Sequence, residues 1–171
     1  MKLVHNVFDV QQYLDIKQQA FLSFSQDSDE YWTNHDVWSA NLKDGIDGTV
    51  LCQHVSDKYN KIIAECIKPH LPEWDGEYDM MWYVWDKGSG INWHNDLPHK
   101  FAATIYLNDN WPKEHGGVFL WQENKTYDIH GWLPKANTMV VNNHGEQHYV
   151  TPITSNALVC RHTIQIFPRE S

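Results

Sequence analysis

The second half of the chain is a succession of short β-rich runs with no helical pattern between them. Turn-forming stretches such as DKGSG, DNWPKEHGG and NNHGE separate the runs. Runs rich in β-branched and aromatic residues, bounded by Gly, Pro, Asn and Asp, are typical of strands joined by turns. Many short strands without intervening helices favour an antiparallel sandwich or barrel, jelly-rolls included. The expected strands are residues 78–85, 91–96, 101–108, 116–122, 137–143, 148–153 and 158–167.

The first 77 residues indicate mainly helix. Apolar residues recur at roughly helical spacing in a first segment, at Val7, Val10, Leu14, Ile16 and Phe21. A second segment has steps of three and four, at Val55, Tyr59, Ile62, Ile63, Cys66 and Ile67. Pro69 and Pro72 end this second helix. Between the two segments, QDSDEYWTNHDVW (26–38) is expected to form a loop or short strands.

These patterns predict a mainly β protein with N-terminal helices. At 171 residues the chain is expected to form a single domain, 1–171. Within it, residues 1–77 would be a mostly helical support region, and residues 78–168 the jelly-roll core. The helices would pack outside the β core.

Charge and composition narrow the class of partner. The net charge is −9, and the first 80 residues carry 14 acidic and 6 basic side chains. A broad phosphate-binding surface is therefore not expected, which argues against nucleic acid. No apolar run approaches the roughly 20 residues that cross a bilayer, and the start lacks the apolar stretch of a signal peptide. Cys52, Cys66 and Cys160 are odd in number and widely spaced, which fits a reducing cytoplasm.

INWHND (91–96) carries two potential metal ligands. In an extended strand His94 and Asp96 share one face, because side chains alternate. A second histidine from a distant strand would complete a 2-His-1-carboxylate face, which is diagnostic of non-haem Fe(II) oxygenases. Alone, the pair is more typical of a polar strand face than of a metal site.

His148 is the best candidate for the third ligand, because it opens the β-branched run HYVTPI. Its rival His144 lies in the turn-like stretch NNHGE. The histidines in other turn-rich contexts are expected at the surface: His99, His115 and His130.

Arg161 is one of only two arginines. It shares a strand face with Thr163, and alternation leaves open whether that face meets solvent or the barrel interior. In the interior, Arg161 could hold a carboxylate through two parallel hydrogen bonds, and Thr163 could donate a third.

With HxD, a later histidine in HYVTPI and the following arginine strand, the sequence resembles the Fe(II)/2-oxoglutarate-dependent dioxygenases, most closely their prolyl-4-hydroxylase-like branch. The similarity runs from Tyr78 to Pro168 and includes ATIYLNDNW, EHGGVFLW and NTMVVNN. The resemblance implies a double-stranded β-helix that uses Fe(II), 2-oxoglutarate and O2. It implies that His94, Asp96 and His148 hold the iron and that Arg161 binds the distal carboxylate of 2-oxoglutarate.

Two further positions match residues of this family. Tyr106 matches a tyrosine that supports the carboxylate in some members, although a core aromatic is an equal reading. Thr163 stands where other members carry Ser or Thr. The sequence departs from the branch in two ways. Arg161 follows His148 by thirteen residues, more than is usual. In this branch an aromatic residue that faces the co-substrate often precedes a Gly-containing turn. Here Tyr83 and Trp85 both stand near that place, so the sequence does not assign the role to one of them.

The expected activity is hydroxylation of prolyl residues in a protein or peptide. A free amino acid or another small molecule is the alternative substrate. Seven tryptophans between residues 74 and 132 could line a substrate groove or belong to the core and its rim. They also leave open a non-enzymatic reading, a carbohydrate-binding jelly-roll.

Overall fold

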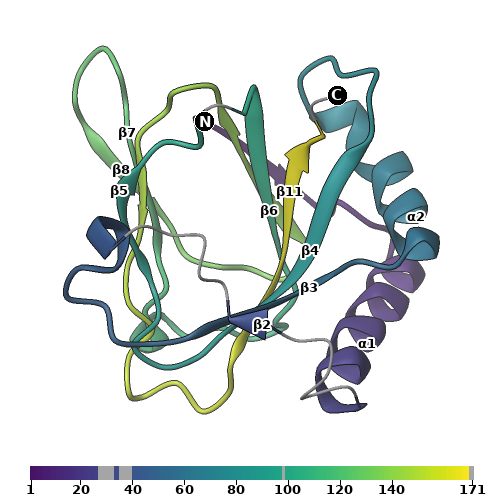
Figure 1. The fold of residues 1–171 in the computed structure, drawn as a ribbon, viewed down its shortest axis with the longest axis horizontal. Coiled ribbons are helices and arrows are strands. Elements are labelled where there is room, and N and C mark those ends of the chain that lie inside the picture. Colours follow the sequence, from purple (N-terminus) through teal and green to yellow (C-terminus); the bar gives the residue numbers. More distant parts are fainter. Residues whose placement is uncertain (27–32, 35–39, 98, 170–171) are drawn as a thin grey trace.

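The computed structural model describes residues 1–26, 33–34, 40–97 and 99–169, and it consists of two antiparallel sheets and two helices (Figure 1). The seven-stranded sheet has the order β1-β9-β6-β11-β4-β3-β2, and the four-stranded sheet the order β5-β10-β7-β8. This arrangement confirms the mainly β jelly-roll.

The strands of the large sheet are β1 (Lys2–His5), β2 (Thr33–Asn34), β3 (Val50–His54), β4 (Tyr78–Trp85), β6 (Phe101–Tyr106), β9 (Thr138–Asn143) and β11 (Arg161–Pro168). Those of the small sheet are β5 (Ile91–His94), β7 (Phe119–Gln122), β8 (Ile129–Trp132) and β10 (His148–Val150). The helices are α1 (Val10–Gln26) and α2 (Asp57–Ile67), with short 3-10 turns at Ala40–Lys43, Lys68–His70 and Lys113–His115.

Alternation along the central strands divides the interior into two cores. On one face of β4 and β11, residues such as Trp82 and Ile164 pack with Ile16 and Ile63 of the helices. On the other face, a second core fills the space between the sheets, and includes Tyr83, Trp85, Tyr106, Phe119 and Val150. The helices therefore cover the outer face of the large sheet, as expected, and the small sheet covers its inner face (Figure 1).

The second predicted helix is confirmed as α2, whose stripe buries Tyr59, Ile63 and Ile67. The first helix is confirmed as α1, but its predicted apolar stripe is only partly right. Ile16 is buried as predicted, whereas Val10, Leu14 and Phe21 are exposed. Tyr13 and Ala20, which the stripe left out, complete the buried side. Tyr13 can be buried because its hydroxyl hydrogen is shared between two acceptors, the Leu107 carbonyl at 2.7 Å and the Asp109 carboxylate at 2.8 Å.

Strands β1 and β3 lie in the region read as mostly helical, and the sequence predicted neither. β1 pairs with β9 at one edge of the large sheet, and β3 pairs with β4 near the other edge. Of the stretch 26–38, Thr33–Asn34 form the short strand β2, and most of the remainder lies outside the described residues. β8 was also missed, because a histidine and a glycine interrupt its short run, IHGW.

His162 on β11 points toward the helices rather than toward the small sheet. Only 5% of its surface is exposed. Its ring stacks on Phe21 at a centroid distance of 4.0 Å. Burial lowers its pKa to about 4, whereas an unfolded histidine titrates near 6.5.

This burial predicts a pH-dependent stability. Between about pH 6.5 and 4 the unfolded chain binds the additional proton, so stability falls as pH decreases through that window. His162 is expected to contribute a loss of about 2 kcal/mol between pH 7 and pH 4.5. Urea unfolding of the unaltered protein and of His162→Leu at both pH values measures it. Equal pH dependence in the two proteins would contradict the assignment.

Among the described residues, no helix has both the length and the apolar character required to cross a membrane.

Candidate functional site

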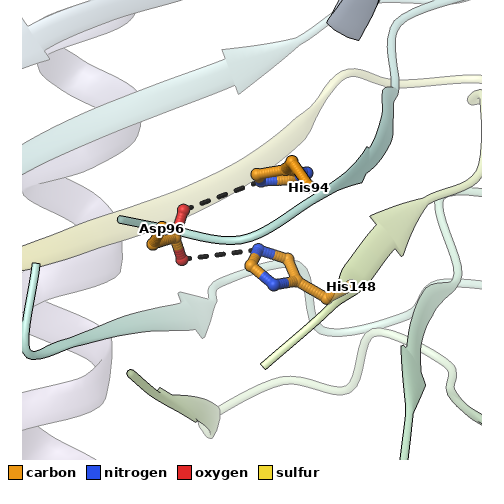
Figure 2. Close-up of side chains that lie close together, drawn as sticks. All are labelled: His94, Asp96 and His148. Atoms are coloured by element: carbon orange, nitrogen blue, oxygen red, sulfur yellow. Dashed lines mark ion pairs between the residues drawn. The ribbon is translucent and has the colours of Figure 1, made fainter. Parts of the chain in front are cut away.

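Two paired strands of the small sheet bring three potential metal ligands together. His94 ends β5, Asp96 follows two residues later, and His148 begins β10 directly opposite His94. The Nε2 atoms of His94 and His148 lie 3.6 and 3.4 Å from the two carboxylate oxygens of Asp96. Figure 2 shows both imidazoles turned toward this carboxylate. The ligand atoms of this triad all lie within 4.8 Å of one another, so they could hold one metal ion.

Backbone carbonyls orient both imidazoles of the triad. Nδ1 of His94 lies 2.7 Å from the carbonyl of Asn92, and Nδ1 of His148 lies 3.0 Å from that of Glu146. Because a carbonyl only accepts hydrogen bonds, each Nδ1 carries the proton and each Nε2 presents its lone pair. Burial lowers the pKa of His94, and the neighbouring His148 lowers it further. Two imidazoles oriented in this way, beside a carboxylate, fit a divalent metal.

The remaining candidate histidines lie outside the triad. His144 is exposed, and its Nδ1 contacts the His99 carbonyl at 3.0 Å. His130 is exposed as expected. The surface prediction is wrong for His115, which is 9% exposed. Its ring packs edge-on against Trp111 at 5.0 Å, because this turn-rich segment folds back onto the core.

A cavity between the two sheets contains the triad. Its wall also includes Arg161, Tyr106 and both aromatic candidates, Tyr83 and Trp85. The cavity is small, with about 50 Å³ of accessible space, so it admits a small molecule or one side chain rather than a length of peptide.

Arg161 is a buried cation in this cavity. Its side chain is 2% exposed, so its strand face meets the interior rather than solvent. Nη1 donates to the Gly117 carbonyl at 2.6 Å, and the guanidinium lies 4.3 Å from the centroid of the Trp85 ring. Its Nε has no hydrogen-bond partner, and no described carboxylate pairs with it. Burial lowers its pKa to about 10, which still leaves it charged at neutral pH.

A buried unpaired charge is costly, so this arginine favours an anion in the cavity. Gly117 makes room for it. The residue has φ +64°, and a Cβ atom there would lie 2.7 Å from Nη1 of Arg161. The local chain therefore requires glycine at this position.

The other predicted co-substrate residues lie around Arg161. Tyr106 is 2% exposed and lines the cavity. Burial raises its pKa to about 12, and the charge of Arg161 opposes that shift. The Thr163 hydroxyl accepts a hydrogen bond from Nε1 of Trp85 at 3.0 Å. Trp85 thus contacts both Arg161 and Thr163. It is also the only one of the seven tryptophans between residues 74 and 132 that lines the cavity.

Asn142 is a cavity residue that was missed from the sequence. It lies on β9, 4% exposed, with Nδ2 3.0 Å from Oδ2 of Asp96 and 3.1 Å from Nε2 of His148. The sequence did contain an indication of its position, because strand alternation places Asn142 on the same face as the buried Val140. A polar residue at such a position requires a partner.

Known proteins share this fold. One structure with the same architecture is a prolyl-4-hydroxylase from Pseudomonas putida, with a TM-score of 0.72 and 15% identity over 99% of this chain and 92% of that chain. Another is a prolyl hydroxylase from Trichoplax adhaerens, solved in complex with a peptide fragment of the hypoxia inducible factor oxygen degradation domain. Its TM-score is 0.74, with 17% identity over 98% of this chain and 82% of that one.

A third similar structure is a non-heme alpha ketoglutarate-dependent epimerase from nogalamycin biosynthesis. It has a TM-score of 0.63 and 12% identity, and it covers 98% of this chain and 76% of that chain. At these identities the similarity shows the fold alone. No curated protein matches the sequence significantly.

The family profile described as the 2OG-Fe(II) oxygenase superfamily matches residues 79–169, just over half of the chain. This span contains the triad and the buried arginine. Membership of this family implies Fe(II), 2-oxoglutarate and O2. The chain belongs to the 2OG-Fe(II) oxygenase superfamily.

Proposed function

We propose that the protein hydroxylates prolyl residues of a protein or peptide, using Fe(II) and 2-oxoglutarate. The observation that carries the proposal is a single cavity that holds both a metal-binding triad and a buried arginine without a carboxylate partner. The first supports an oxidising metal, and the second supports an acidic co-substrate. The two prolyl hydroxylases of the same fold support the choice of substrate.

The triad would hold Fe(II) through His94, Asp96 and His148. Three protein ligands leave three positions open on a six-coordinate ion. When bound, the iron would supply the chemistry that activates O2, the oxidant; one oxygen atom would enter the prolyl residue and the other the succinate that 2-oxoglutarate forms with loss of CO2. The protein contributes position and shelter: Arg161 would pair with the far carboxylate of 2-oxoglutarate, and Tyr106 beside it would donate a further hydrogen bond.

The narrow cavity supports a substrate that enters by one side chain. An extended peptide could place the Cβ–Cγ–Cδ edge of one pyrrolidine ring toward the triad while the flanking residues stay outside. A free amino acid or another small molecule is the second candidate substrate. The non-heme alpha ketoglutarate-dependent epimerase of nogalamycin biosynthesis has a similar fold, and this similarity supports the second candidate.

The test begins without oxygen. The protein is mixed with Fe(II) and 2-oxoglutarate, and we expect the weak visible charge-transfer band of the chelate. Oxygen is then admitted in the presence of proline-containing peptides, matched peptides with alanine for proline, or free amino acids. We expect succinate formation and the gain of one oxygen atom only with the proline peptides.

Each arm has a distinct contradictory outcome. Turnover with free amino acids alone would replace the peptide assignment with the small-molecule one. Absence of both the band and succinate would overturn the oxygenase activity. A carbohydrate-binding jelly-roll is not favoured, because it needs neither the triad nor a buried arginine in one cavity.

A further inference from the structure

The geometry points to Asn142 as a positioning residue that sets the metal affinity of the triad, an inference that rests on the proposed metal site. Its amide lies within hydrogen-bond distance of ligand atoms from two triad members, Asp96 and His148. Asn142 would hold both ligands in the geometry that the ion requires. It would also restrict Asp96 to binding through one oxygen.

Asn142 reaches the triad from the opposite sheet. It lies on β9 of the seven-stranded sheet, where it pairs with Ala102. His148 lies on β10 of the four-stranded sheet, and Asp96 follows β5 of that sheet. The amide therefore fixes the two ligands against the large sheet, independently of their own strands.

The first contact of the amide is a hydrogen bond, which Nδ2 donates to Oδ2 of Asp96 at 3.0 Å. This bond engages one carboxylate oxygen and leaves Oδ1, which faces His94, available to a metal. A carboxylate held in this way cannot readily rotate to bind through both oxygens, so an additional coordination position stays open.

The same amide nitrogen lies 3.1 Å from Nε2 and 3.5 Å from Nδ1 of His148, so it packs over the ring and leaves the in-plane lone pair of Nε2 free for a metal. A carbonyl fixes the Nδ1 edge of this ring, so the ring is held at its edge and on its face. Metal binding would leave this contact and the bond to Asp96 in place. Burying an amide among apolar neighbours is costly unless it is paired, and the partners of this amide are metal ligands.

Cobalt binding tests the inference without relying on turnover. Co(II) alone is titrated under anaerobic conditions, and its visible absorption reports occupancy. Asn142→Leu keeps much of the side-chain volume without the donors, and Asn142→Ser keeps a smaller donor. Loss of an outer hydrogen-bond partner typically weakens metal affinity 10–100-fold. We expect a loss of about that size in Asn142→Leu and a smaller loss in Asn142→Ser.

Asn108→Ala is the matched control for a merely structural role. Asn108 is also a buried asparagine, 8% exposed, and its amide bonds the Cys160 carbonyl and the His162 amide. We expect Asn108→Ala to lower the melting temperature and to leave Co(II) affinity unchanged. Co(II) affinities of both Asn142 variants within about twofold of the unaltered protein would overturn the inference. Failure of the unaltered protein to bind Co(II) would instead overturn the metal site itself.

Discussion

His148→Ala is expected to weaken Fe(II) binding by more than about 100-fold, because outer partners of metal ligands alone contribute 10–100-fold. The loss would remove the anaerobic chelate band and 2-oxoglutarate turnover together. The physical reason is that Nε2 of His148 is the potential ligand from β10, and without it only Asp96 and His94 would remain to bind the ion. Metal titration and the visible spectrum measure both effects.

His144→Ala is the matched control for this variant. The two histidines are four residues apart, and the sequence alone left them as rivals. His144 is exposed and contacts a backbone carbonyl rather than the triad. We expect its replacement to leave metal affinity and the band unchanged. A normal band in His148→Ala, or a lost band in His144→Ala, would reverse the ligand assignment.

Arg161→Met is expected to weaken 2-oxoglutarate binding while Fe(II) binding persists. Removing one partner of a buried charge pair costs about 3 kcal/mol or more, which is a little over 100-fold in Kd. In the unaltered protein, 2-oxoglutarate should raise the melting temperature, because ligands that bind only the folded state stabilise it. Arg161→Met should lose this response. Calorimetric titration and thermal melts with and without 2-oxoglutarate measure the two effects.

The only other arginine provides the control. Arg169 is exposed and pairs with Glu77 and Asp79 at the surface, and exposed pairs contribute little. Arg169→Met should bind 2-oxoglutarate normally. An equal thermal response to 2-oxoglutarate in both variants would contradict the assigned role of Arg161.

The parts of the fold that strand periodicity encodes were predictable. Residues 78–85 form β4 with the predicted bounds. Alternation correctly separated the two faces of β11 but left open which face meets the interior, and the structure places Arg161 inside and Ile164 against the helices. His94 and Asp96 lie together because a local spacing of two residues is enough to place them. The histidine choice also followed from local context, because a β-branched run continues from His148 and none from His144.

Predictions that depended on distant partners were less reliable. The buried face of α1 includes Tyr13, whose hydroxyl partners Leu107 and Asp109 lie more than 90 residues away. Local apolar spacing therefore placed exposed residues in the predicted stripe and left Tyr13 out. β1 is a short edge strand that pairs with β9, more than 130 residues later in the sequence. Asn142 was missed for the same reason, because its partners lie on the opposite sheet.

The division of the site between the sheets links its occupancy to the integrity of the fold. The triad belongs to the small sheet and its flanking turn, whereas Arg161 and Asn142 belong to the large one. A co-substrate bound to iron at one end and to Arg161 at the other would act as a removable cross-link between the layers. Separation of the sheets and release of the co-substrate would then be coupled, so that loading the site resists opening of the sandwich.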